Sequence, residues 1–266
     1  MGEAMWQNKR ISIVFPAYNE EPNIRRAVRE FLEIPVVDEV IVVDNNSRDR
    51  TNQEAQEAGA RVILETKQGY GNALRRGMAE ASGDLIVLCE PDGTFEGRDL
   101  HKLLAYADDF DMVLGTRTTQ ELIWQDANMN HILRLGNLVV AKLLEFLFGG
   151  PSLSDCGCTF RLITRAAYQK IQPHLTVGGS HFLPELVIWG LLRQQRLIEI
   201  PVNYLGRVGE SKITGNWKGI VKTGWAMFCL ILWLRFKIFS YPEEFRKTRP
   251  RGRGISRPKT ADPVKE

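Results

Sequence analysis

The sequence has few cysteines and lacks the common signatures of redox and ATP chemistry. Its four cysteines show no spacing suited to zinc or to a disulfide framework, so we expect reduced thiols at Cys89, Cys156, Cys158 and Cys229. A G-x-G-x-x-G turn after the first predicted strand and a P-loop are both absent, which argues against a dinucleotide enzyme and against an ATPase.

Long apolar runs are missing as well. The apolar segment 223–234 lies between Lys222 and Arg235, and as a helix it would measure about 18 Å against a hydrocarbon core of roughly 30 Å. We therefore expect this segment to lie in a membrane interface, with Trp225 and Trp233 at headgroup depth. A helix buried in the protein core is the alternative. The first ten residues contain no apolar core, so we expect no secretory signal.

Positive charge is concentrated near the C-terminus. The formal net charge is only +3, yet residues 246–259 hold seven Lys or Arg and no acidic residue. Such a composition cannot build a core and predicts a disordered basic tail over 246–266. An anionic membrane surface or nucleic acid would attract this tail, and a plain solvated terminus is the alternative. We expect the membrane surface and no nucleic acid.

The first half of the chain alternates short apolar runs with helical patterns. Runs too short for helices predict buried strands at 11–15, 40–43, 61–65, 85–89 and 112–116. Helical patterns lie between them at 21–32, 52–58 and 70–81, and a longer one follows at 132–150. This alternation predicts an α/β fold with a mostly parallel sheet flanked by helices.

Three domain-level segments are expected along the chain. Residues 1–215 would form one catalytic domain, because no repeat or linker interrupts them. Residues 216–245 would form an amphipathic, membrane-associated helical segment, and 246–266 the basic tail.

Carboxylates follow three of the predicted strands directly. Glu20 comes soon after the first strand, Asp44 follows the second, and Glu90-Pro91-Asp92 follows the strand at 85–89. Ligands of open α/β sheets bind outside the carboxyl ends of the strands, so these side chains should meet at one edge. Clustered carboxylates repel unless a cation lies between them, and Mg²⁺ bound to a diphosphate takes one or two carboxylates. One such carboxylate alone could cap a helix, but three at one edge predict a site for a polyanion or a metal.

Several motifs carry a resemblance to a known family. They are PAYNEE at 16–21, VVDNNS at 42–47, Lys67-x-Gly69-x-Gly71, SGDLIVLCEPDG at 82–93 and GTR at 115–117. Together they resemble family 2 glycosyltransferases, which have the GT-A fold. Asp155, Phe160-Arg161 and IPVNYLGRVGESK at 200–212 resemble the dolichyl-phosphate mannose synthase branch, which includes bacterial polyprenyl-phosphate glycosyltransferases. The resemblance covers about residues 10–215.

The resemblance implies roles for individual residues. It implies catalytic roles for Asp92, Asp155 and Arg117, and metal ligation of Mg²⁺ or Mn²⁺ by Asp92 and Glu90. It implies binding of the nucleotide sugar by Pro16, Ala17, Tyr18, Glu20, Asp44, Lys67, Gly71 and Asp92. It implies contact with the acceptor phosphate or the diphosphate by Arg117, Arg134, Arg161, Arg207, Ser211 and Lys212.

The chain departs from the family pattern at two places. The usual Asp-x-Asp metal motif reads Glu90-Pro91-Asp92, and the usual Gly-Phe-Arg reads Thr159-Phe160-Arg161. The first change makes the prediction of metal ligation stronger for Asp92 than for Glu90, because Glu90 has a longer side chain next to a rigid proline. The second changes the surface near the sugar.

The acceptor chemistry favours the same branch. A sugar hydroxyl needs a general base to remove its proton, whereas a lipid monophosphate is already anionic and needs cations to position it. We therefore expect an inverting, metal-dependent hexosyltransferase that moves a sugar from a nucleotide diphosphate to a polyprenyl monophosphate. The loop 206–215 would close over the diphosphate. The protein would be cytoplasmic and peripheral to the membrane through residues 219–240 and the basic tail.

Two other functions fit parts of the sequence. One is a family 2 glycosyltransferase with a soluble hydroxylated acceptor, as in polysaccharide or natural-product assembly. The other is a basic membrane-binding or nucleic-acid-binding module without enzymatic activity, which explains only the tail and residues 219–240.

Overall fold

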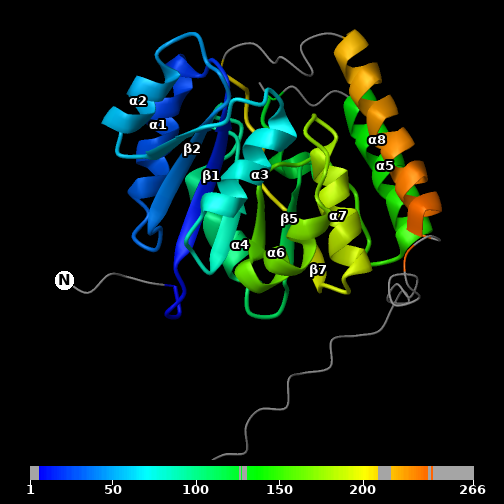
Figure 1. The fold of residues 1–266 in the computed structure, drawn as a ribbon. Coiled ribbons are helices and arrows are strands. Elements are labelled where there is room, and N and C mark those ends of the chain that lie inside the picture. Colours follow the sequence, from blue (N-terminus) through cyan, green and yellow to red (C-terminus); the bar gives the residue numbers. More distant parts are fainter. Residues whose placement is uncertain (1–5, 126, 128–130, 209–216, 239–240, 242–266) are drawn as a thin grey trace, which may run out of the picture.

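A seven-stranded sheet organises the part of the chain that the computed structural model describes, which is residues 6–125, 127, 131–208, 217–238 and 241. The strands are ordered β3-β2-β1-β4-β6-β5-β7. All neighbouring pairs are parallel except the two that involve β6. The prediction of a mostly parallel α/β sheet flanked by helices is confirmed (Figure 1).

The predicted elements of the first half appear with small shifts of their ends. The strands are β1 (Ile11–Ala17), β2 (Glu39–Asp44), β3 (Arg61–Leu64), β4 (Leu85–Leu88), β5 (Met112–Thr116), β6 (Arg161–Thr164) and β7 (Leu197–Pro201). The α-helices are α1 (Glu21–Leu32), α2 (Thr51–Glu57), α3 (Tyr70–Glu80), α4 (Leu100–Leu104), α5 (His131–Phe148), α6 (Arg165–Ile171), α7 (Phe182–Leu192) and α8 (Trp217–Lys237). Single turns of 3₁₀ helix occur at η1 (Gly97–Asp99), η2 (Gln120–Leu122) and η3 (Gln172–His174).

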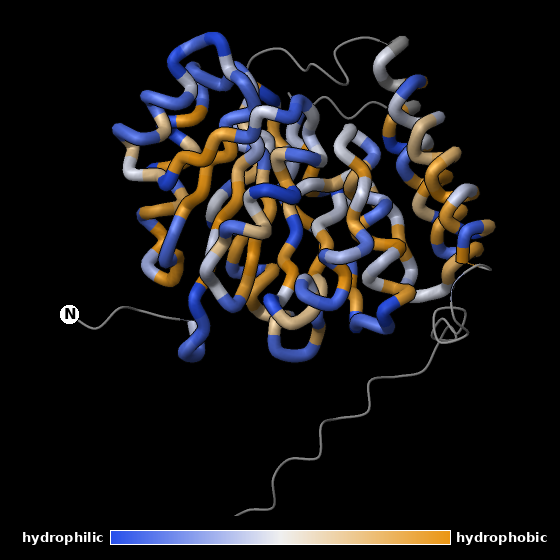
Figure 2. The backbone as a smooth tube through the Cα atoms, viewed as in Figure 1, coloured by the Kyte–Doolittle hydropathy of each residue, from blue (hydrophilic) through white to orange (hydrophobic). Residues whose placement is uncertain are grey.

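The central strands are apolar because helices cover both faces of the sheet (Figure 2). Successive side chains of a strand point to opposite faces. In β1, Val14 joins the core that contains Leu74 of α3, whereas Phe15 joins the opposite core with Phe31 of α1. Every residue of β1 is buried, which is why the strand is apolar at every position except Ser12 rather than alternating.

Strand β6 reverses the sheet locally and was not predicted. It lies between β4 and β5 and is antiparallel to both, with Arg161 opposite Leu88 of β4 and Leu114 of β5. Because β6 runs the opposite way, its first residue lies at the edge where β4 and β5 end. The residues that precede β6 are therefore brought to the same edge as the residues that follow β4 and β5.

Helices α5 and α8 pack side by side at one end of the molecule (Figure 1). One face of α8 is buried, with Leu230, Ile231 and Leu234 in the core that also contains Leu144 of α5. The other face exposes apolar residues, among them Trp225 and Trp233. The core alternative for 223–234 therefore holds for one face of α8, and contact of the exposed face with a membrane stays a prediction. Among the described residues, no helix is both long and apolar enough to cross a bilayer.

The cysteines divide into three buried thiols and one exposed thiol. Cys89, Cys156 and Cys158 are buried, whereas Cys229 is exposed on α8. Burial raises the pKa of Cys156 and of Cys158 to about 12. All four are free thiols in the structure. The basic tail at 246–266 lies outside the described residues.

Candidate active site

A cleft of about 740 Å³ opens at the carboxyl edge of the sheet. One part of its lining is polar and follows the strand ends, with Glu20 after β1, Glu90 and Asp92 after β4, and Arg117 after β5. The other part is formed by α5 and α8, from which Leu135, Val139 and Met227, among others, line the same cleft. Polar and apolar surfaces therefore share one continuous cavity.

Two carboxylates in the cleft share one guanidinium. Arg207 Nη2 lies 2.8 Å from Glu20 Oε1, and Arg207 Nη1 lies 2.8 Å from Asp92 Oδ2. Asp92 is buried, and its other oxygen, Oδ1, accepts hydrogen bonds from the backbone N–H and the hydroxyl of Thr94. The buried Oδ2 atom forms the ion pair without an aligned hydrogen bond. Among the described residues, Asp92 Oδ2 is therefore paired with Arg207 alone, and a metal ion bound to this oxygen would take the place of that guanidinium.

Glu90 is held by two hydroxyl groups. Its Oε1 atom accepts a hydrogen bond of 3.0 Å from the Tyr70 hydroxyl and one of 3.0 Å from Thr159 Oγ1. The two hydroxyls also contact each other. The two departures from the family pattern, at positions 90 and 159, are therefore in direct contact. The longer glutamate reaches the hydroxyl that a glycine at position 159 would lack.

Burial and charge repulsion raise the pKa of Glu90 to about 7. Burial is the larger cause and the nearby Asp92 carboxylate is the second, while the Arg117 and Arg207 guanidiniums oppose the rise. Among the described residues, no three His, Cys, Asp or Glu side chains are placed to hold a metal together. Two hard oxygen donors still fit a divalent ion that takes its remaining ligands from a diphosphate and water.

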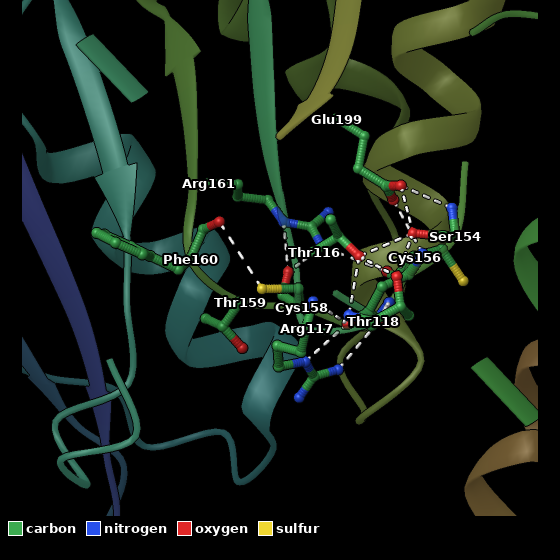
Figure 3. A network of polar contacts seen from close by, with 12 residues as sticks. Thr116, Arg117, Thr118, Ser154, Cys156, Cys158, Thr159, Phe160, Arg161 and Glu199 are labelled. Atoms are coloured by element: carbon green, nitrogen blue, oxygen red, sulfur yellow. Dashed lines mark hydrogen bonds and ion pairs between the residues drawn. The ribbon is translucent and has the colours of Figure 1, made fainter. Parts of the chain in front are cut away.

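Arg117 reaches the cleft from a buried polar network (Figure 3). Its guanidinium binds Asp155 through two hydrogen bonds, Nε to Oδ2 at 2.7 Å and Nη2 to Oδ1 at 3.0 Å. The guanidinium carbon also lies 5.3 Å from the centre of the Tyr204 ring, which lines the cleft. Asp155 is fully buried; burial opposes ionisation, but the Arg117 charge and hydrogen bonds hold the pKa of Asp155 below its usual value. Asp155 thus orients Arg117 rather than lining the cleft itself.

Comparison with known proteins identifies the family. The model of Glycosyl transferase family 2 matches residues 12–172. The chain belongs to glycosyl transferase family 2. It is an enzyme that transfers sugars, as the motifs predicted, and the non-enzymatic alternative is set aside.

Two relatives come from Haloferax volcanii. A dolichyl-phosphate hexose transferase is 30% identical over 204 residues, which cover 76% of this chain and 86% of the relative. The low-salt glycan biosynthesis hexosyltransferase Agl6 is 31% identical over 209 residues, which cover 76% of this chain. The match spans only 49% of the length of Agl6.

Solved structures share the fold. Glucosyl-3-phosphoglycerate synthase of Mycobacterium tuberculosis, crystallised with Mn²⁺, uridine diphosphate and glucosyl-3-phosphoglycerate, superposes with a TM-score of 0.69 at 21% identity. The match covers 88% of this chain and 82% of that one. The same synthase in complex with phosphoglyceric acid gives a TM-score of 0.68. The GT-A fold expected of family 2 is therefore confirmed.

Most residues that the family motifs assign to the nucleotide sugar lie in the cleft, but three do not line it. Pro16, Ala17, Tyr18, Glu20 and Asp92 belong to the lining. Asp44 is buried beside it and accepts a hydrogen bond from the Ser47 backbone N–H. Lys67 lines a second pocket, of about 600 Å³. Gly71 packs inside α3, where a Cβ atom would lie 2.6 Å from the Val177 carbonyl oxygen.

The structure contradicts the expectation that Arg161 faces a phosphate. Arg161 begins β6, and its side chain turns inward, where it is 1% exposed. Its guanidinium donates hydrogen bonds to the carbonyl oxygens of Cys156, Cys158 and Leu183. These hydrogen bonds hold the guanidinium inside the protein, away from the cleft. Arg161 therefore holds the chain that precedes β6 and is not placed to bind a ligand.

The other residues expected to contact a phosphate lie in different places. Arg207 lines the cleft, as does Arg117. Arg134 lies on α5 but is not part of the lining, which its neighbours Leu133 and Leu135 provide. Ser211 and Lys212 lie outside the described residues, as does most of the predicted loop 206–215.

Sequence reasoning missed several residues of the cleft. Asn45, Gln68, Tyr70 and Tyr204 line it on the polar side. Asn45 organises the neighbouring loop, because its amide contacts the backbone of Glu65, Lys67 and Gly69. Asn45 directly follows β2, so the strand-end rule that singled out Asp44 applies equally to it.

Proposed function

We propose that this family 2 glycosyltransferase moves a hexose from a nucleotide diphosphate sugar to a polyprenyl monophosphate, with inversion at the anomeric carbon. One observation carries the proposal: a single cleft joins the strand-end carboxylates to an apolar surface between α5 and α8. A donor needs the first surface and a lipid chain needs the second. The similarity to a dolichyl-phosphate hexose transferase supports the same acceptor.

The donor would occupy the polar part of the cleft. Asp92 and Glu90 would hold a divalent cation, Mg²⁺ or Mn²⁺, which when bound would offset the negative charge of the diphosphate. Glu20 and the residues Pro16, Ala17 and Tyr18 after β1 would contact the nucleoside. Arg207 is paired with Glu20 and Asp92, so its guanidinium would lie beside the diphosphate.

The acceptor phosphate would bind opposite the leaving diphosphate. An oxygen of the lipid monophosphate attacks the anomeric carbon, and the bond from that carbon to the diphosphate oxygen breaks. The phosphate is already an anion, so no residue has to remove a proton. Arg117 would orient the phosphate with its guanidinium, which Asp155 fixes through two hydrogen bonds. Leu135 and Val139 of α5 and Met227 of α8 would contact the first part of the prenyl chain.

The outer faces of α5 and α8 suit a membrane surface. Large apolar side chains are exposed there, including Phe146 on α5 and Trp225, Trp233 and Phe236 on α8. Lys237 lies 4.3 Å above the Trp233 ring, and pairs of tryptophan with a cation are typical of the headgroup region. We propose peripheral attachment to the cytoplasmic face through these helices, with the basic tail as an additional anchor.

Transfer to a soluble acceptor is the second candidate. It is favoured by the shared fold with glucosyl-3-phosphoglycerate synthase, which has been crystallised with phosphoglyceric acid. Such an acceptor would use the polar part of the cleft alone and would give the apolar surface between α5 and α8 no role.

A donor and acceptor screen tests the proposal. The purified protein is incubated with Mn²⁺, each common nucleotide sugar, and either polyprenyl phosphate in detergent or a soluble phosphorylated acceptor. We expect a sugar-1-phosphate linkage on the lipid, with one nucleotide sugar preferred, and loss of product in Arg117→Ala. Transfer to the soluble acceptor at a higher kcat/KM than to the lipid would overturn the proposal.

A further inference from the structure

Glu199 on β7 accepts three hydrogen bonds from one short turn (Figure 3). Its Oε2 atom accepts from the backbone N–H of Ser154 at 2.7 Å and from the Ser154 hydroxyl at 2.6 Å. Its Oε1 atom accepts from the backbone N–H of Asp155 at 2.9 Å. Strand β7 pairs with β5, and Glu199 lies opposite Leu114. Because β5 ends at Thr116, one residue before Arg117, Glu199 lies close to the chain that carries Arg117. The carboxylate therefore fixes the position of residues 154–155.

Two sets of hydrogen bonds connect this turn to Arg117 and its neighbours. In the first, Asp155 binds the Arg117 guanidinium with both carboxylate oxygens. In the second, Ser154 Oγ lies 2.8 Å from Thr116 Oγ1 and 2.7 Å from Thr118 Oγ1, which flank Arg117 in sequence. The first set of contacts thus holds the charged group, and the second holds the side chains of its two sequence neighbours.

The Glu199 carboxylate also sets the direction of the hydroxyl network. A serine hydroxyl has one proton to donate, and Ser154 gives it to Glu199. Ser154 Oγ can then only accept from Thr116 and Thr118. Removing the charge from Glu199 frees the Ser154 proton and allows the hydroxyls to rearrange. A long arginine side chain loses rotamer freedom when it is held in one geometry, so an ordered support matters for its alignment.

We propose that Glu199 is a positioning residue that holds Arg117 in the orientation required to bind the acceptor phosphate. The identity of that anion rests on the proposed function, whereas the support of Arg117 does not. Glu199 itself is not part of the cleft lining. It acts through Ser154 and Asp155, and its effect should reach only interactions that Arg117 makes.

The chain offers a matched control in Glu185 of α7. The Glu185 carboxylate accepts hydrogen bonds from the backbone N–H of Thr176, the Thr176 hydroxyl and the backbone N–H of Val177. Glu199 accepts the same set of donors from Ser154 and Asp155. Among the described residues, no hydrogen bond or ion pair joins Glu185 to the network around Arg117, so Glu185→Gln reports the general cost of weakening such a turn.

The test measures binding of a short-chain, water-soluble prenyl monophosphate by calorimetry in the presence of Mn²⁺ and a nucleoside diphosphate. We expect Glu199→Gln to weaken this binding about tenfold, or about 1.4 kcal/mol, and to change nucleotide affinity by less than about twofold. Glu185→Gln should lower the unfolding midpoint without changing either affinity. In an Arg117→Ala background, adding Glu199→Gln should have no further effect, because coupled residues are non-additive. Additive effects would overturn the proposal.

A second measurement separates this proposal from the proposed function. The Arg117 Nε–H resonance, assigned by its loss in Arg117→Lys, should shift in Glu199→Gln and stay unchanged in Glu185→Gln. If wild-type protein fails to bind the prenyl phosphate but the resonance shifts, the acceptor assignment fails and the positioning role stands. An unchanged Arg117 resonance in Glu199→Gln refutes the positioning role. Should Glu199→Gln not fold, Ser154→Ala removes the serine hydroxyl alone and is expected to shift the same resonance; no shift there refutes it equally.

Discussion

The exposed aromatic residues of α5 and α8 allow a quantitative prediction about membrane attachment. We consider a variant in which Phe146, Trp225 and Phe236 are replaced by serine. These side chains are 77%, 66% and 71% exposed, respectively. They contribute little to the core, which α8 reaches instead through Leu230, Ile231 and Leu234. The variant therefore removes surface that would contact lipid and leaves the packed face of α8 intact.

The exposed fractions give an upper limit for the lost affinity. A buried aromatic side chain covers about 200 Å², so each of the three exposes about 140 Å². At about 25 cal/mol per Å², full transfer of this surface to lipid is worth about 10 kcal/mol. Incomplete insertion and the lost freedom of the bound protein reduce this value severalfold. A loss of about 3 kcal/mol still corresponds to more than a 100-fold change in the partition constant.

Flotation with neutral liposomes provides the assay, because neutral lipid excludes the electrostatic contribution of the basic tail. Wild-type protein should float and the triple variant should stay in solution, with nearly the same unfolding midpoint. Replacement of Leu64 and Tyr106, which are 56% and 40% exposed outside α5 and α8, serves as the control and should leave flotation unchanged. Undiminished flotation of the folded triple variant would refute the assignment of this face to the membrane.

Three further predictions concern the metal, pH and the tail. Asp92→Asn should lower kcat at least about tenfold, which corresponds to about 1.4 kcal/mol of activation free energy. The effect of Glu90→Gln on kcat should be milder. Undiminished rates in excess chelator, together with an Asp92→Asn rate near that of wild type, would exclude the metal from the mechanism. Because the folded-state pKa of Glu90 is about 7 against an ordinary value of 4.5, protonated Glu90 stabilises the metal-free protein fully below about pH 4.5, and this contribution is lost as pH rises through 7. Relative to Glu90→Gln, wild type should therefore lose up to about 3 kcal/mol of unfolding free energy between about pH 5 and pH 8, and a pH-independent difference in thermal melts contradicts this assignment. Deleting 246–266 should weaken binding to anionic liposomes and reduce its dependence on salt, since each tail cation contributes about 1 kcal/mol that salt screens; equal loss on neutral liposomes would contradict an electrostatic role.

The carboxylates of the site could be predicted from local sequence because one rule connects them to the fold. Short apolar runs identified the parallel strands, and ligands bind where such strands end. Glu20, Glu90 and Asp92 follow those strands and line the cleft. No tertiary information was needed, because parallel strands bring their carboxyl ends to one edge wherever they lie in the sheet.

The parts that escaped prediction depend on tertiary placement. Strand β6 is four residues long, and nothing in RLIT shows that it enters the sheet antiparallel between β4 and β5. That placement determines where the Arg161 side chain lies. The motif suggests a phosphate ligand, but the guanidinium is buried and donates hydrogen bonds to three carbonyl oxygens. Likewise, the apolar lining from Leu135 and Met227 requires α5 and α8 to be adjacent, although nearly 70 residues separate them.

The distribution of the thiols has a practical consequence for labelling. Thiolates are the reactive form of cysteine, and burial with a raised pKa protects Cys89, Cys156 and Cys158. Maleimide reagents should therefore modify the natural chain at Cys229. This residue lies one helical turn from Trp225 and one from Trp233 on α8, on the face assigned to lipid. An environment-sensitive fluorophore at Cys229 would report how deeply α8 enters a bilayer without any engineered cysteine.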